Sequence, residues 1–267
     1  MKTLKVGDIV LGEGKPKICI PLVSSTAEGL LKEAAAAAKK PCDLVEWRAD
    51  YFLDAMGGLV LSEVCRRLKL LIKEIKNITG KPVIFTIRTE MEGGKIGLKN
   101  EGYFYINKVI AETGLADFID IEAFDAPGVV PEDEIRDFVE FAHANNTYVL
   151  MSNHDIEGTP DQEELMTRMF VMQSLGADVM KLVVTPESQE DVLELLATAA
   201  IMKDHYAEIP FIVISMGELG TNTRVCGGEF GSVMTFAAGK KASAPGQIGA
   251  VQLKMLLDKY YGEEESK

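Results

Sequence analysis

The stretch Asp178-Val-Met-Lys-Leu-Val-Val184 decides the fold. Apart from Asp178 and Lys181 it is apolar, and a short apolar run without alternation is typical of a parallel strand buried on both faces. Segments of helical periodicity precede it at residues 161–175 and follow it at residues 189–202. A buried strand between two helices is the unit of an α/β protein.

The same alternation of short apolar runs and helical segments continues along almost the whole chain. The candidate strands are Lys17–Val23, Asp43–Ala49, Pro82–Arg88, Phe118–Phe124, Tyr148–His154, Val179–Val184, Phe211–Met216 and Val233–Ala237. The candidate helices are Glu28–Ala38, Leu61–Ile75, Glu101–Thr113, Glu132–Ala144, Asp161–Leu175, Gln189–Met202 and Gly246–Tyr260. This number of units in 267 residues predicts a single (β/α)8 TIM barrel, because a doubly wound sheet usually needs fewer strands and a clear switch point.

The ends of the chain carry the parts that lie outside this alternation. No Pro/Gly/Ser-rich linker divides residues 1–267, so we expect one domain. Residues 1–14 are expected to form a short hairpin that covers the bottom of the barrel. Residues 262–267, which end in Glu-Glu-Glu-Ser-Lys, are expected to form a frayed tail.

Composition excludes several classes of function. The chain is 47% hydrophobic and 26% charged, as in a soluble globular protein, and no run approaches the roughly 18 apolar residues of a membrane span. The N-terminus lacks the apolar core of a signal peptide, so we expect a cytoplasmic protein without membrane contact. A net charge of −13 disfavours nucleic acid as a partner, and an anionic substrate would need a local group of arginines and lysines. The cysteines are far apart, which favours free thiols and no zinc site: Cys19, Cys42, Cys65 and Cys226.

Lys181 is the unusual residue of its strand. Burying an unpaired ammonium costs several kcal/mol. Such a lysine is therefore paired with an acid, reaches water at the strand end, or is held as a neutral amine that can attack a ketone. This run alone leaves all three interpretations open.

Charged residues fall on single faces of two other strands. Glu46, Arg48 and Asp50 share one face of their strand, and Asp120 and Glu122 share a face of theirs. Because a closed barrel has no edge strand, we expect these faces to point inward. The two acids of the second strand are then possible partners for interior cations.

Further candidates stand at strand ends, where barrels collect their chemistry. Arg88 ends the third strand and is a candidate anion clamp, because guanidinium forms bidentate bonds to carboxylate or phosphate. Glu92-Gly93-Gly94 begins a loop that is expected to be flexible and to carry its carboxylate over the barrel mouth. His154 ends the strand next to that of Lys181 and is a candidate general acid and base, with a core histidine as the alternative.

The last third of the chain adds a candidate anion site. Arg224 follows the seventh strand, and the small-residue loop 241–248 precedes the final helix. In barrels this region commonly binds a substrate anion through backbone N–H groups at a helix N-terminus. Pro245-Gly246 is equally consistent with a structural turn.

Five motifs occur in order along the chain: Glu46-Trp-Arg48, Phe85-Thr-Ile-Arg88 with Glu92-Gly-Gly94, Ser152-Asn-His-Asp155, Met180-Lys181 and Ser243-Ala-Pro-Gly-Gln247. Their residues and order closely resemble the type I 3-dehydroquinate dehydratases of the shikimate pathway, over essentially the whole barrel. The resemblance implies a (β/α)8 barrel, a homodimer, and loss of water from 3-dehydroquinate to give 3-dehydroshikimate. It also implies that no metal and no organic cofactor is used.

The resemblance implies a role for each matching residue. Lys181 would form an imine with the C3 ketone of the substrate, and His154 would move protons in a syn elimination while Glu92 orients it. The positions that would hold the substrate's hydroxyls and carboxylate, with Arg224 as the carboxylate partner, are Glu46, Arg48, Arg88, Arg224, Ser243 and Gln247. We also expect that a crowded cationic site favours the neutral amine of Lys181.

One departure and two alternatives accompany this interpretation. Pro21 stands on the first strand where many relatives carry a serine near the substrate, which puts that contact in doubt. A class I aldolase also places an imine-forming lysine in a barrel but usually acts on phosphorylated sugars. A non-catalytic sensor of a cyclic polyol acid would bind without turnover, and loss of Lys181 or His154 would have indicated it; both are present.

Overall fold

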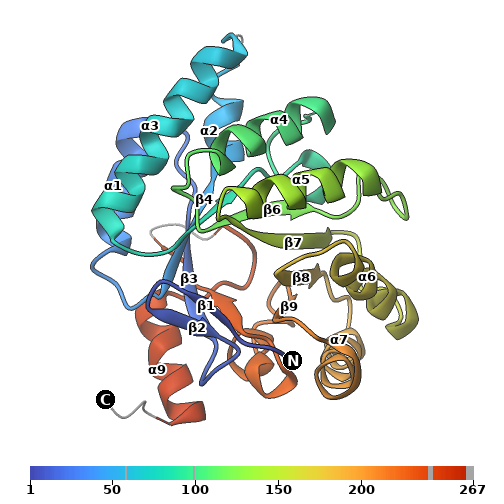
Figure 1. The fold of residues 1–267 in the computed structure, drawn as a ribbon. Helices are drawn as coiled ribbons and strands as arrows, with labels where there is room; N and C mark the ends of the chain where they lie inside the picture. The colour runs from blue at the N-terminus through green and yellow to red at the C-terminus, as the bar shows by residue number, and fades with distance from the viewer. Residues whose placement is uncertain (58, 99, 240–242, 263–267) are drawn as a thin grey trace.

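Eight parallel strands form a nearly closed barrel in the computed structural model, which describes residues 1–57, 59–98, 100–239 and 243–262. Figure 1 shows the helices around the outside of the strands. The strands follow one another around the barrel in the order β10-β3-β4-β5-β6-β7-β8-β9. Their bounds are β3 Lys17–Leu22, β4 Leu44–Arg48, β5 Val83–Thr86, β6 Phe118–Glu122, β7 Tyr148–Asp155, β8 Val179–Val184, β9 Phe211–Ser215 and β10 Met234–Phe236. The predicted (β/α)8 class is confirmed.

The barrel closes between β9 and β10 through a short contact. Phe211 and Ser232 form a parallel bridge, and the Val233 N–H donates to the Phe211 carbonyl at 2.9 Å. The Ser232 hydroxyl accepts from the Val213 N–H at 3.2 Å and so replaces a carbonyl that a longer strand would supply. Side-chain bonding thus completes the ring where backbone pairing ends.

The helices connect successive strands and cover the barrel from outside. Their bounds are α1 Ala27–Ala37, α2 Ala49–Asp54, α3 Leu61–Thr79, α4 Asn100–Ala111, α5 Glu132–Ala144, α6 Gln162–Ser174, α7 Gln189–Ile201, α8 Thr223–Cys226 and α9 Ala250–Tyr261. Helix starts follow from capping: Thr26 and Asp161 accept backbone N–H groups of α1 and α6, and Ser188 forms a capping box with Asp191 at α7. None of the described helices has the length and apolar character needed to cross a membrane.

Some element bounds differ from those predicted, for local reasons. Asp50 lies in α2 and not on the preceding strand, because the chain turns into a helix directly after Arg48. The final helix begins at Ala250 and not at Gly246, whose φ of 74° belongs to a turn. Strand β5 ends at Thr86, two residues before Arg88. The predicted frayed tail lies outside the described residues from 263 onward, as do residues 241 and 242 of the predicted anion loop.

The N-terminal hairpin covers one end of the barrel. Strands β1 (Leu4–Val6) and β2 (Ile9–Leu11) pair antiparallel, as predicted. Val6 and Leu11 are buried in one cluster with interior residues near the strand starts, among them Leu44 and Phe118. Because this hairpin occupies the end where the strands begin, the other end is left for a functional site.

Candidate active site

A cavity of about 420 Å³ opens where the barrel strands end. All nine residues predicted for the site line it: Glu46, Arg48, Arg88, Glu92, His154, Lys181, Arg224, Ser243 and Gln247. They come from β4, β7 and β8, from the turn after β5, from α8 and from the loop before α9. A cavity of this size accommodates a small organic molecule. The barrel therefore gathers into one place the residues that are far apart in sequence.

Lys181 lies inside the barrel on β8, with 5% of its surface exposed. Its Nζ is 3.5 Å from Glu46 Oε1, 3.5 Å from Asp120 Oδ2 and 4.5 Å from the centre of the Phe236 ring. These groups all interact favourably with an ammonium. The lysine is therefore paired with acids, and the expectation of a crowded cationic setting is wrong for its nearest charges. A nucleophilic role requires a neighbouring group to take a proton from this amine.

The two acids beside Lys181 are held by hydroxyl groups of neighbouring strands. Thr86 Oγ1 donates to Glu46 Oε1 at 3.0 Å, and Ser152 Oγ donates to Asp120 Oδ1 at 2.6 Å. In the β7–β8 register Ser152 is the partner of Lys181. The expected inward position is confirmed for Glu46 and Asp120 but not for Asp50, which lies in α2. The hydrogen bonds from Thr86 and Ser152 fix the two carboxylates beside the amine.

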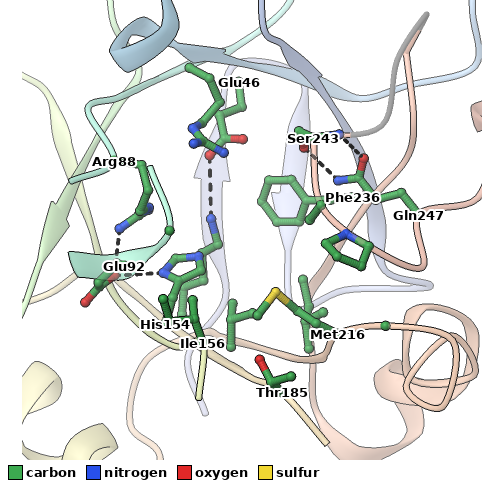
Figure 2. Close-up of a pocket in the computed structure, with 18 of the residues that line it drawn as sticks. Glu46, Arg88, Glu92, His154, Ile156, Thr185, Met216, Phe236, Ser243 and Gln247 are labelled. Atoms are coloured by element: carbon green, nitrogen blue, oxygen red, sulfur yellow. Dashed lines mark hydrogen bonds and ion pairs between the residues drawn. The ribbon is translucent and has the colours of Figure 1, made fainter. Parts of the chain in front are cut away.

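His154 and Glu92 form a pair at the cavity wall. His154 Nδ1 lies 2.8 Å from Glu92 Oε2. Figure 2 shows the two side chains turned toward each other. Within the described part of the chain, the other ring nitrogen, Nε2, has no protein partner of this kind, and the residue lines the cavity. A histidine bonded through Nδ1 to a carboxylate presents Nε2 for proton transfer.

Arg88 binds the carboxylates behind this pair. Its Nη1 donates to Glu92 Oε2 at 2.9 Å, to Glu122 Oε1 at 3.0 Å and to Ser152 Oγ at 2.9 Å, and Nη2 donates to Asp120 Oδ2 at 2.8 Å. The guanidinium is buried, and a buried cation needs such partners. The structure thus shows Arg88 as a clamp on protein acids; its contact with a substrate stays a prediction.

The turn that carries Glu92 is tight and not an open, flexible loop. Glu92 ends a short 3-10 helix, Glu90–Glu92, and is 4% exposed. Gly93 has a φ of 81°, and a Cβ on Gly94 would lie 1.9 Å from the Arg88 carbonyl oxygen. Only glycine allows this approach, which turns the carboxylate back over the barrel toward His154.

The charges around the pair set where its proton resides. Burial lowers the pKa of His154 well below its usual value, and the charges of Arg88 and Lys181 act in the same direction. Burial raises the pKa of Glu92 well above its usual range, Glu122 adds to this, and the Arg88 charge opposes it. Because the two groups share one hydrogen bond, they titrate as a pair.

Arg224 is a buried cation with no acid beside it in the described part of the chain. It is 2% exposed, and its Nη1 and Nη2 donate only to the carbonyls of Phe236 at 3.4 Å and Pro245 at 3.0 Å. Within the described residues no carboxylate pairs with it and its Nε has no hydrogen-bond partner. Burial lowers its pKa to about 10, so it stays charged at neutral pH. A charged guanidinium of this kind at a cavity wall fits an anion.

The remaining predicted residues are bonded within the protein. The Ser243 N–H donates to Gln247 Oε1 at 2.8 Å, and Gln247 Nε2 donates to Ser243 Oγ at 2.8 Å. Figure 2 marks both bonds between these two residues. Arg48 makes a bidentate pair with Asp50, at 2.8 Å and 2.9 Å. Pro21 is not among the described residues that line the cavity.

The sequence did not indicate the largely apolar side of the cavity. Ile156, Thr185, Met216 and Phe236 also line the cavity (Figure 2). Each stands at or just after the end of a strand, and that position is the signal that could have found them. In the part of the chain that the structure describes, no three His, Cys, Asp or Glu side chains form a metal-binding group.

Comparisons with known proteins agree with this geometry. A family model for type I 3-dehydroquinase matches residues 18–264. The chain belongs to the type I 3-dehydroquinase family. The family resemblance that the five motifs indicate is therefore confirmed, and it extends over nearly the whole chain.

Relatives of this chain match it over almost their full length. The 3-dehydroquinate dehydratase of Clostridium kluyveri is 45% identical over 95% of this chain and 96% of its own. That of Bacillus licheniformis is 43% identical over 96% of both. The crystal structure of type I 3-dehydroquinate dehydratase from Clostridium difficile with covalently modified comenic acid has a TM-score of 0.89 and 37% identity, and the match covers 97% of this chain and 98% of that one.

Proposed function

We propose that this chain is a 3-dehydroquinate dehydratase that removes water from 3-dehydroquinate through an imine on Lys181. One observation carries the proposal: a single cavity holds a buried amine, a histidine–carboxylate pair and the buried cation Arg224, which has no acid partner among the described residues. The substrate offers a ketone, an acidic C–H group and a carboxylate to match them. A homodimer in the cytoplasm, with a place in the shikimate pathway, stays a prediction from the same family.

The reaction follows from the nucleophile and the pair. The neutral Lys181 amine adds to the C3 carbonyl, and the proton that Lys181 lost before the attack returns to the departing carbinolamine hydroxyl. Loss of that water leaves a protonated imine that withdraws electrons from C2. His154 Nε2 takes the C2 proton, and the resulting enamine expels the C1 hydroxyl as His154 returns a proton to it. Hydrolysis of the imine consumes one water and releases the amine. The net change is loss of one water from C1 and C2, with both proton transfers on one face.

The electrostatics of the pair support the base role. Because burial lowers the pKa of His154, its imidazole is neutral at neutral pH and can accept a proton. The imidazolium then formed donates Nδ1–H to Glu92, which offsets the cost of a buried positive charge. Glu46, 3.5 Å from the amine, is placed to take the proton that Lys181 must lose before it attacks.

The far side of the cavity holds the substrate in this proposal. Arg224 binds the carboxylate, and this contact supplies the acid partner that its buried guanidinium lacks. Ser243 and Gln247 exchange their mutual hydrogen bonds for bonds to the substrate, which keeps their polar atoms satisfied before and after binding. Glu46 and Arg48 face the substrate hydroxyls from β4.

Arg224→Gln is expected to raise KM for 3-dehydroquinate about 100-fold and to change kcat by less than about 5-fold, because it removes a charged hydrogen bond to a group that does not react. Steady-state kinetics measure both constants. The fold should survive, since a neutral amide costs less to bury than an unpaired guanidinium. Arg136→Gln, at an exposed position on α5, is the matched control. An unchanged KM in the Arg224 variant would contradict its assignment.

The activity itself is tested by incubating the protein with 3-dehydroquinate and following the absorbance of the conjugated product. The proposal predicts catalytic formation of 3-dehydroshikimate and no cleavage of phosphorylated sugars. Cleavage of a sugar phosphate would instead identify a class I aldolase. Saturable binding of 3-dehydroquinate without any product would identify a sensor.

A further inference from the structure

Asn153 connects the Glu92 carboxylate to a cation that lies outside the barrel. Its neighbours Ser152 and His154 contact the interior, so on a strand Asn153 points to the other face. There its Nδ2 donates to Glu92 Oε1 at 3.1 Å, and its Oδ1 accepts from Arg168 Nη1 at 3.0 Å. Asn153 is 8% exposed, so water competes little for either bond. The mechanism described above gives these two residues no part.

Arg168 fixes which way the Asn153 amide faces. A guanidinium only donates hydrogen bonds and a carboxylate only accepts them, so one of the two amide orientations satisfies both neighbours. The reversed amide would place Oδ1 against the Glu92 carboxylate and Nδ2 against the guanidinium. Arg168 is itself held by Asp155 Oδ2 at 3.0 Å and by Glu164 Oε1 at 2.8 Å, at the start of α6.

The protonation state of Glu92 decides whether His154 can act as a base. If Glu92 is ionised, Nδ1 carries the ring hydrogen and Nε2 has a free lone pair. If Glu92 is protonated, it donates to Nδ1, the hydrogen moves to Nε2, and that nitrogen cannot accept a proton. The tautomer of His154 with a free lone pair on Nε2 therefore requires an ionised Glu92, and hydrogen-bond donors around Glu92 favour that ionised form.

Donors and acids compete for this carboxylate. The charged and titratable groups that face the pair are Arg88, Asp120 and Glu122 on the side of Glu92, and Arg48 and Lys181 on the side of His154. Burial favours a proton on Glu92, the two acids add to this, and Arg88 Nη1 opposes it at Oε2. Asn153 Nδ2 opposes it at Oε1. Each oxygen of Glu92 thus has a donor that the fold holds in place.

We propose that Asn153, oriented by Arg168, is a positioning residue that keeps Glu92 ionised and turned toward His154 Nδ1. The inference rests on the proposed dehydratase mechanism. Its effect on the reaction is to keep Nε2 of His154 ready to accept the substrate proton.

The sharpest variant is Asn153→Asp. It keeps the size of the side chain and an acceptor for Arg168, but it replaces the donor at Glu92 Oε1 by a carboxylate oxygen. Size matters because a second cavity of about 270 Å³ borders Asn153 and Arg168, and water could enter the space left by a truncated residue. A carboxylate at this point disfavours ionisation of Glu92, so the pair holds its proton to higher pH.

Asn153→Asp is expected to lower kcat about 10- to 100-fold, with KM changed less than about 3-fold, and to move the acid side of the kcat–pH profile to higher pH. In ligand-free protein, ¹⁵N NMR of the His154 ring should show Nε2 keeping its hydrogen to higher pH than in the wild type. Glu164→Gln removes another partner of Arg168 and is expected to stay within about 2-fold of wild-type kcat. Arg168→Lys, which keeps a donor, should retain more activity than Arg168→Leu.

An Asn153→Asp protein with wild-type pH dependence of kcat and of the His154 ring would overturn the inference. A loss of kcat that only matches a loss of folded protein, measured by circular dichroism, would overturn it as well. The NMR titration needs no substrate, so it separates this inference from the proposed function. Absence of dehydratase turnover in the wild type would count against the function, whereas an unshifted ring titration would count against the role of Asn153.

Discussion

Lys181→Met is expected to lower kcat for 3-dehydroquinate by roughly 10⁵-fold or more, because methionine fills a similar volume but offers no amine to form the imine. Without the imine, the C2 proton has no electron sink next to it, and the base at His154 has no acidic group to act on. Steady-state turnover at high enzyme concentration measures the effect. Lys32→Met, at a position 74% exposed on α1, is the matched control and should keep wild-type activity.

Structural loss can be separated from chemical loss in the Lys181 variant. Removing the ammonium leaves Glu46 and Asp120 with one cation fewer at 3.5 Å, so we expect a lower Tm. A lower folded fraction reduces the apparent kcat only in proportion to the protein that is unfolded. Binding of 3-dehydroquinate, measured by calorimetry, reports whether the cavity of the folded fraction is intact. A variant that keeps more than about 1% of wild-type turnover would contradict the nucleophilic role.

His154→Gln is the second large effect, with an expected fall in kcat of about 10³- to 10⁴-fold. Glutamine can keep a hydrogen bond to Glu92 but cannot exchange protons with C2 or with the leaving hydroxyl. Glu46, 3.5 Å from the amine, can take the Lys181 proton without His154, so imine formation should persist at least in part. Mass spectrometry of the intact protein after borohydride reduction would show the trapped adduct while turnover is lost.

The control for this variant is His143→Gln. His143 lies on α5 with its side chain 44% exposed and pairs with Asp178, away from the cavity. It should leave kcat unchanged. Wild-type turnover in the His154 variant would rule out its acid and base role, and loss of the adduct together with turnover would move His154 to the imine-forming step.

The barrel could be predicted from the sequence because its determinants are local. The apolar run around Lys181 predicts a strand from its own residues alone. Repetition of such runs between helical segments along the chain then favours a (β/α)8 barrel over other α/β folds. The inward position of Glu46 and Asp120 follows from the two-residue period of a strand. The hairpin of residues 4–11 followed from its apolar positions in the same way.

The partners of each charged residue could not be predicted, because they depend on how separate elements meet. The sequence predicted several arginines near Lys181. In the structure Arg88 instead binds Glu122 and Asp120, and the nearest charges to Lys181 are the carboxylates of Glu46 and Asp120. The bond from Arg168 to Asn153 depends on the rotation of α6 about its axis, which periodicity fixes only coarsely. Such contacts decide the charge state of a site and require the three-dimensional arrangement.

The most direct test of the imine is reduction by sodium borohydride in the presence of 3-dehydroquinate, followed by peptide mass mapping. Hydride adds to the imine carbon and converts the bond to a stable secondary amine. The expected result is a single adduct, on Lys181, that is absent without 3-dehydroquinate and absent in Lys181→Met. Full turnover with no adduct on Lys181, or with the adduct on another lysine, would contradict the proposed mechanism.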